Sequence, residues 1–276
     1  MIKQVLVPTD GSDEAAIGVR YAIAVARHYG ATLHGLHVVD VKLLEGPFLR
    51  DISASLGTAP YVNYEGNISA LLETRGKAAL DVFARACQDA GVTYETTQTT
   101  GLVVRSIVER SELADLIVMG RAGEHGEWLE GLLGSTTQGV VRRATRPILV
   151  TGTDVPGNSQ YLVAYDGSQH ARSALQMAAT VSVEWGAPLH VLSVGDERVS
   201  ELLDEARSYL EAYDIAVDCS RREGDPSEVI VDCAAECEAD LLVMGAYGHT
   251  KVRELVIGST TAYAMNHAPC PLLLTR

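Results

Sequence analysis

Short apolar runs alternate along the chain with longer segments in which apolar residues recur every three or four positions. Val5-Leu6-Val7 is such a run and predicts a buried strand, and the periodic segment 15–29 predicts a helix that ends at Gly30. The same alternation predicts later strands at 32–39, 93–98, 115–119, 147–150, 162–165, 189–194, 215–220, 241–244 and 272–274. It predicts helices at 68–90, 103–112, from 135, 171–185, 201–213, 227–236 and 260–266. Strands that alternate with helices are typical of α/β folds, in which helices cover both faces of a parallel sheet.

The chain repeats itself. Four pairs of segments match in the same order: 10–12 with 166–168, 33–40 with 189–196, 118–120 with 243–245, and 134–137 with 258–261. We therefore predict two tandem domains, residues 1–153 and 154–276, each a doubly wound, Rossmann-like α/β unit. Residues 151–160 contain turn-forming residues and suit a linker. Residues 41–67 are not matched in the second half and lack clear periodicity, so we expect a lid, a packing arm or disorder there.

Composition narrows the class of protein. The chain has 276 residues, of which 47% are hydrophobic, so each half can bury its own core. It contains no run of 18 apolar residues and its start does not resemble a secretory signal, which predicts a soluble, cytoplasmic protein. The net charge of −14 argues against nucleic acid and anionic membranes as partners. Residues 1–153 carry 14 Lys+Arg against 17 Asp+Glu (−3), and residues 154–276 carry 8 against 19 (−11).

Cysteines and strand histidines suggest structural roles. The odd set of five cysteines comprises Cys87, Cys219, Cys233, Cys237 and Cys270, which we interpret as reduced, packed thiols. Cys233 and Cys237 share one face of a predicted helix, yet no histidine or second cysteine pair stands nearby in the sequence to complete a zinc site. We therefore expect no metal site. His34 and His190 alternate with apolar residues inside strands and are expected to be structural.

A glycine-spaced loop follows the predicted strand 241–244. Gly245-Ala-Tyr-Gly248 is followed by nine residues and then by Gly258-Ser259-Thr260 at the start of a helix. Ligands bind at this edge of open parallel sheets, and a helix N-terminus with free N–H groups and hydroxyls favours an anion. His249, Lys251 and Arg253 add basic side chains to an acidic half. We predict phosphate binding here, although the Walker and dinucleotide glycine motifs are both missing.

This spacing resembles the G-x2-G-x9-G-(S/T) signature of the universal stress protein family, and the whole chain is similar to its tandem-domain members. The residues that carry the signature are Gly245, Gly248, Gly258 and Ser259. The resemblance implies one adenine nucleotide per domain, with its phosphates on the glycine loop. The implied ribose and base contacts are Ala164, Tyr165, Asp166 and Val194.

The first half departs from the signature. Ten residues, one more than the signature has, separate Gly123 from Gly134, and the loop contains Glu124, Glu127 and Glu130. Carboxylates near a triphosphate weaken binding unless they point to solvent, which we favour, or bind a divalent cation. The candidate nucleotide contacts of this half are Pro8, Thr9, Asp10, Val38, Gly120, Arg121, Gly123, Gly134, Ser135 and Thr136, with Arg121 and His125 as compensating cations. We expect the second site to bind better.

Four other candidates each have two interpretations. Asp10 and Asp166 could bond a ribose hydroxyl or help place Mg²⁺, or could only cap the helix that follows. Tyr247 could cover the phosphates or pack, and Trp128 could cover a ligand but more often such an aromatic faces a partner. No catalytic constellation is readable from the spacing, so we expect binding, or very slow hydrolysis, rather than an efficient enzyme.

We therefore predict a cytoplasmic stress-response protein that binds ATP, ADP or AMP with Mg²⁺ and acts through its nucleotide state on a protein partner. The alternatives are an enzyme that hydrolyses ATP slowly or transfers an adenylyl or phosphoryl group, and a nucleotide-free scaffold that docks partners through 41–67 and Trp128. We expect the two domains to form an internal pseudo-dimer by pairing strand 147–150 with strand 272–274, and a homodimer of whole chains is open.

Overall fold

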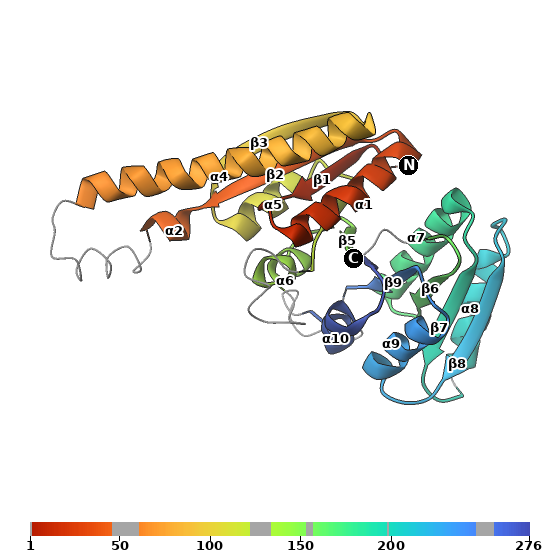
Figure 1. The fold of residues 1–276 in the computed structure, drawn as a ribbon. Helices are drawn as coiled ribbons and strands as arrows, with labels where there is room; N and C mark the ends of the chain where they lie inside the picture. The colour runs from red at the N-terminus through yellow and green to blue at the C-terminus, as the bar shows by residue number, and fades with distance from the viewer. Residues whose placement is uncertain (1, 46–60, 122–133, 153–156, 198, 247–256) are drawn as a thin grey trace.

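The computed structural model describes residues 2–45, 61–121, 134–152, 157–197, 199–246 and 257–276, with the backbone alone at 44, 45 and 61–67. Strands and helices alternate as expected (Figure 1). The strands are β1 (Gln4–Pro8), β2 (Thr32–Asp40), β3 (Tyr94–Gly101), β4 (Leu116–Met119), β5 (Ile148–Val150), β6 (Tyr161–Ala164), β7 (Leu189–Val194), β8 (Val217–Arg222), β9 (Leu241–Gly245) and β10 (Leu272–Thr275). The helices are α1 (Asp13–Tyr29), α2 (Val41–Glu45), α4 (Tyr61–Ala90), α5 (Val103–Ser111), α6 (Ser135–Val141), α7 (Gln169–Trp185), α8 (Val199–Leu210), α9 (Pro226–Glu236) and α10 (Ser259–His267).

The ten strands in the described part of the chain belong to one sheet. Their order is β3-β2-β1-β4-β5-β10-β9-β6-β7-β8, which places the second half beside the first with the strand order reversed. The neighbours within each half are parallel, and among the described strands only β5 and β10, at the junction, are antiparallel, with Leu149 opposite Leu273. The predicted edge pairing is therefore confirmed, and we call the β5–β10 junction the seam.

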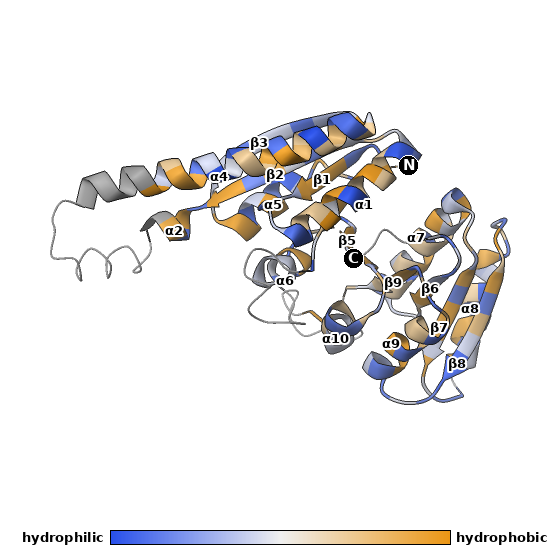
Figure 2. Ribbon diagram, viewed as in Figure 1, coloured by the Kyte–Doolittle hydropathy of each residue, from blue (hydrophilic) through white to orange (hydrophobic). Residues whose placement is uncertain are grey.

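Helices cover both faces of the sheet, so the α/β, doubly wound class is confirmed. The core on one face draws on α1, α4, α7 and α8, and the core on the other face draws on α5, α6, α9 and α10. Each core contains buried residues from both halves and runs without interruption across the seam. Figure 2 shows orange and blue residues mixed along α1 and α4, as expected of helices that pack one side against a sheet.

The first helix of each half begins with the same short turn. The hydroxyl of Ser12 accepts a hydrogen bond from the Ala15 N–H at 3.2 Å, and Ser168 accepts one from Ala171 at 3.1 Å. The glycine before each serine has a positive φ, +83° at Gly11 and +73° at Gly167, a backbone conformation that favours glycine. The repeated Asp-Gly-Ser sequence therefore encodes a helix start.

Several helix boundaries differ from those predicted from the sequence. The segment 41–67 was expected to lack regular structure, which is wrong at both ends: α2 covers 41–45, and α4 begins at Tyr61, directly after Pro60. Proline disrupts the interior of a helix but is tolerated next to its start. Because Pro60 indicates irregular structure when the sequence is considered alone, the predicted helix start lies later, at residue 68. Residues 46–60 lie outside the described residues. The helix predicted to reach 213 ends at Leu210, because the chain turns there and the Ile215 N–H donates to the Tyr213 carbonyl at 3.0 Å.

Aromatic side chains of α1 and α7 meet over the seam. The His28 ring stacks on the Trp185 ring with centroids 4.1 Å apart, and the Trp185 Nε1–H donates to the Tyr29 hydroxyl at 3.2 Å. Beneath them lies a mostly apolar cavity of about 90 Å³, whose walls include Leu149 and Leu273. Within the described ranges, none of the helices has the length and apolar character needed to cross a lipid bilayer.

Candidate functional site

In each half, the end of one strand is tied to the start of one helix. The Thr137 hydroxyl donates to the Gly120 carbonyl at 2.9 Å, and the Thr261 hydroxyl donates to the Gly245 carbonyl at 3.2 Å. These bonds join the ends of β4 and β9 to the first turns of α6 and α10. The N-termini of α6 and α10 therefore open at the carboxyl-end edge of the sheet, where parallel sheets bind ligands.

The first turn of α10 presents polar groups at this edge. Gly258, its N-cap, has no side chain to bond the helix N–H groups, and Ser259 is exposed while Thr260 is half-buried. Gly134, Ser135 and Thr136 have the same burial pattern at the start of α6, which is only seven residues long. Both helix starts offer N–H donors and hydroxyls together, the combination that favours an anion.

Part of each loop lies outside the described residues. In the first half, the Gly134 N–H donates to the Arg121 carbonyl at 2.8 Å, which closes the base of the loop. The predicted residues for which the structure gives no account are Gly123, Glu124, His125, Glu127, Trp128, Glu130, Tyr247, Gly248, His249, Lys251 and Arg253. Their roles remain predictions.

The aspartates that follow β1 and β6 shape the helix start. Asp10 Oδ1 accepts bonds from the Ser12 N–H at 3.0 Å and hydroxyl at 2.6 Å, and Asp166 Oδ1 accepts from the Ser168 N–H at 2.9 Å. These are Asx turns, in which the side chain orders its own loop. These hydrogen bonds support the capping interpretation of both aspartates. A role of either aspartate toward ribose or Mg²⁺ stays a prediction.

The residues before these aspartates are held by their neighbours. The Thr9 carbonyl accepts from His37 Nδ1 at 2.9 Å, and the Tyr165 carbonyl accepts from the Ser193 hydroxyl at 2.6 Å. His37 and Ser193 occupy matching positions of the repeat, one residue before Val38 and Val194, which are half-buried at the same edge. The bonds fix how far β1 and β6 extend beside β2 and β7.

Tyr165 has a structural side chain. It is 2% exposed, and its hydroxyl donates to Glu205 Oε1 at 2.7 Å, while Arg172 pairs with the same carboxylate at 2.9 Å. Burial, followed by the bond to Glu205, raises the pKa of Tyr165 to about 12. The phenol is thus directed toward α8, and only the strand end at Tyr165 is left as a candidate ligand contact, with Ala164 half-buried beside it.

Arg121 spans the seam. Its guanidinium donates to three backbone carbonyls, those of Thr151 at 3.2 Å, Ala268 at 2.7 Å and Cys270 at 2.6 Å. Burial lowers the pKa of Arg121. The sequence suggested that this side chain could offset the loop glutamates, but its donors are used between the halves, so we leave its charge out of the proposed phosphate contacts.

Gly245 is required by close packing. A Cβ there would lie 2.8 Å from the His170 Cβ and 2.9 Å from the His170 carbonyl carbon at the start of α7. Real Cβ contacts are rarely that short, so this glycine lets α7 approach the end of β9. Its role is to bring the Asp-Gly-Ser turn and the glycine loop together.

Sequence reasoning missed the residues that position the site. Thr137 and Thr261 are the last letters of the repeated Gly-Ser-Thr-Thr, so the repetition itself could have identified them. His37 and Ser193 differ in type, and their shared role toward a strand-end carbonyl could not be recognised without the fold. In both pairs the side chain acts on the backbone rather than on a ligand.

Comparison with known proteins agrees with this arrangement. The model of the universal stress protein family matches residues 1–152, 159–212 and 199–276. Universal stress protein Slr1230 from Synechocystis sp. is 30% identical over 287 residues, covering all of both chains. Universal stress protein MJ0531 from Methanocaldococcus jannaschii is 35% identical over 153 residues, 54% of this chain and 82% of its own.

Solved structures show the same fold. A universal stress protein from Archaeoglobus fulgidus superposes with a TM-score of 0.77 at 24% identity, over 99% of this chain and 96% of its own. The family model covers nearly the whole sequence, and the full-length relative agrees with it. The chain therefore belongs to the universal stress protein family.

Proposed function

We propose that this protein binds an adenine nucleotide at the carboxyl-end edge of its sheet, most tightly in the second half, and acts as a nucleotide-dependent regulatory module. The phosphates would contact the first turn of α10 and the glycine loop after β9. The ribose and base would lie by Ala164, Asp166 and Val194. Mg²⁺ would accompany the triphosphate, with the carboxylate of Asp166 as its candidate protein ligand.

The observation that carries the proposal is the tie between β9 and α10. The Thr261–Gly245 bond aims the uncapped first turn of α10 at the edge where β6, β7 and β9 end. A helix N-terminus provides N–H donors and partial positive charge without a basic side chain. An anion with a planar, partly apolar body suits an edge that also offers half-buried Ala164 and Val194.

Charge distinguishes the two halves. In the second half the loop sequence contains His249, Lys251 and Arg253, in the first it contains three glutamates, and Arg121 is occupied at the seam. These differences support tighter binding in the second half.

Bound nucleotide can be identified directly. Mass spectrometry of the supernatant from denatured, purified protein should find an adenine nucleotide at up to one equivalent per occupied site. Calorimetry with Mg-ATP should give a dissociation constant in the micromolar to millimolar range, and omission of Mg²⁺ should weaken it. The proposal would be overturned if the protein carried no nucleotide and showed no measurable affinity for it. Rapid steady-state turnover that is lost in Asp166→Ala would replace the proposal with an enzymatic one.

A matched pair of variants locates the stronger site. Ser259→Glu puts a carboxylate at the first residue of α10, where it repels phosphate but suits the helix dipole, so the fold should be retained. We expect at least tenfold weaker ATP binding. Ser135→Glu makes the same change at α6 and should have the smaller effect on the tight site. Equal losses in both would contradict the proposed asymmetry.

A further inference from the structure

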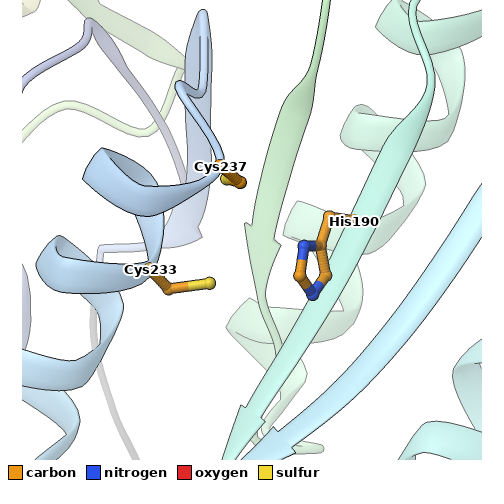
Figure 3. Close-up of side chains that lie close together, drawn as sticks. All are labelled: His190, Cys233 and Cys237. Carbon is orange, nitrogen blue, oxygen red and sulfur yellow. The ribbon is translucent and has the colours of Figure 1, made fainter.

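Three side chains that are separate in the sequence meet on one face of the second half. One ligand atom from each of His190, Cys233 and Cys237 lies within 4.8 Å of the other two. Figure 3 shows His190 on β7 and both cysteines at the end of α9, with the Cys233 side chain pointing toward the imidazole. The sequence placed the cysteines on one helix face without a partner, and the partner comes from a neighbouring strand.

The fold explains why they meet. His190 and Leu192 point to the same face of β7, and Leu192 belongs to the core that contains Cys233. Helix α9 runs back against the strand direction, so its C-terminus lies near the start of β7, where His190 stands. Cys237 is the C-cap of α9, and its N–H donates to the Cys233 carbonyl at 3.0 Å. Both sulfurs thus belong to one turn.

A hydrogen bond sets the orientation of the imidazole. His190 Nε2 lies 2.6 Å from the Ser220 hydroxyl on β8. When Nε2 donates its proton to Ser220, Nδ1 carries the lone pair that a metal ion needs. Histidines that bind metals usually donate their second ring N–H to a neighbouring acceptor in this way. Ser220 therefore provides the outer contact expected of such a site.

We propose that Cys233, Cys237 and His190 form a zinc site, with the fourth position open to water or a small ligand. Two thiolates and an imidazole are ligands that favour Zn²⁺ over Mg²⁺ or Ca²⁺. Tetrahedral zinc requires about 3.7 Å between sulfurs and about 3.5 Å between sulfur and nitrogen. The three atoms already lie within 4.8 Å of one another, so they need to close by at most about 1 Å.

The charges also balance. Two thiolates cancel the charge of Zn²⁺, so the metal would add no net charge to a region where Cys233 is fully buried and Cys237 and His190 are half-buried. The site lies at the starts of the strands, whereas the nucleotide is proposed at their ends, so zinc and nucleotide would bind independently. In the first half, α5 contains no cysteine, and His34 instead contacts Gln4 and Glu95. The site would thus be specific to the second half.

The metal can be tested on the whole chain. Protein that has been reduced and stripped with a chelator would be titrated with Co²⁺, which reports thiolate ligands by charge-transfer absorption, and then with Zn²⁺. We expect one Co²⁺ per chain, with thiolate absorption that Zn²⁺ displaces. No stoichiometric uptake of either ion by the reduced protein, or a disulfide between Cys233 and Cys237 with no uptake after reduction, would overturn the proposal.

Variants identify the ligands. Cys233→Ser and Cys237→Ser should each abolish or weaken uptake at least tenfold, and His190→Gln should weaken it at least tenfold. Uptake should be unchanged in Cys219→Ser, on the opposite face of β8, and in His34→Gln, at the matching position of the first half. Wild-type uptake by the Cys233→Ser, Cys237→Ser double variant would contradict the assignment.

A second readout needs no variant. Zn²⁺ should protect Cys233 and Cys237 of the wild-type protein from alkylation in mild denaturant, measured by peptide mass spectrometry, and should leave the rate at Cys219 unchanged. Equal rates with and without Zn²⁺ at the two cysteines would argue against the site even if a cysteine variant did not fold.

Discussion

Single residues in this protein act chiefly by holding backbone in place. The two threonines at the helix starts, the two aspartates after β1 and β6, and Arg121 all bond main-chain atoms. Side chains of this kind position a ligand edge without contacting the ligand. Glycines contribute by allowing close approach of the backbone, and two of them differ in how much room they leave for a side chain.

Gly245→Ala should destabilise the fold. The added Cβ would lie 2.8 Å from the His170 Cβ and 2.9 Å from backbone, so α7 or β9 must shift, at a cost of about 1–3 kcal/mol. Gly18→Ala provides the control, because a Cβ on this residue of α1 would lie 3.6 Å from its nearest neighbour, the Gly120 N, which is an ordinary contact, and the alanine would gain up to about 1 kcal/mol of helix propensity. Urea denaturation of both variants measures the difference, and a neutral Gly245→Ala would contradict the packing argument.

Buried thiols should make stability fall at high pH. Burial raises the pKa of Cys87 to about 11 and that of Cys270 to about 12. Because the folded pKa values are raised, this stability is present below the unfolded value near 8.5 and is lost as the pH rises above it. At pH 10 each thiol should cost the folded state on the order of 1–2 kcal/mol relative to pH 8.

Matched variants separate the thiols from other groups that titrate. Denaturation of the wild type and of Cys87→Ala at pH 8, 9 and 10 should show a shallower decline for the variant, and Cys270→Ala should behave alike. Parallel declines would show that these thiols do not contribute.

At the scale of elements, the seam is the feature that sequence alone anticipated only in outline. The apolar runs 147–150 and 272–274 predicted the pairing of β5 with β10, and the antiparallel register confirms it. The Arg121 bridge was not predictable, because its acceptors are backbone carbonyls, and two of the three, those of Ala268 and Cys270, come near only after the halves pack. Every residue has a backbone carbonyl, so the identity of a residue does not show that its carbonyl will accept such a bond.

Arg121→Met should therefore weaken the seam strongly. It removes the donors of three carbonyls in a largely buried region, and unsatisfied buried groups of this kind cost about 1–3 kcal/mol each before relaxation, so a total loss of about 2–4 kcal/mol is expected. Arg105→Met is the control, since the exposed Arg105–Glu109 pair on α5 contributes below about 0.5 kcal/mol. Thermal and urea denaturation compare the two, and similar losses would contradict the bridge.

Prediction from sequence succeeded where the signal was periodic and failed where it was not. The strands, their order along the chain and the repeated helix starts follow from apolar spacing and from the Asp-Gly-Ser turn. The start of α4 was placed seven residues late, because proline and glycine in 41–67 obscured the pattern. His190 joined two cysteines only through the sheet, so a search along the sequence could not find that cluster.

At the scale of the molecule, the two halves should be energetically coupled. Leu149 and Leu273 face each other across the seam and line its cavity. Each change to Ala should cost about 2–4 kcal/mol, and the double variant should depart from additivity by about 0.5–1 kcal/mol. A cycle that pairs Leu149→Ala with Leu210→Ala, in α8, which packs on β7 and β8 at the edge of the sheet, should be additive within about 0.5 kcal/mol. Additivity in the first cycle would mean that the halves are energetically independent.

The central position of β10 also has a consequence for synthesis on the ribosome. β10 follows the nine other described strands in the chain, yet it lies in the middle of the sheet, between β5 and β9. From Val150 to Thr275 the ribosome adds 125 residues (275 − 150), which takes about 6–25 s at about 5–20 residues per second. Throughout that interval β10 is missing, so the edge of β5 that it will cover can pair with a strand from another nascent chain. Exchange of strands between neighbouring chains on one polysome is therefore the assembly error to which this order of strands is most exposed.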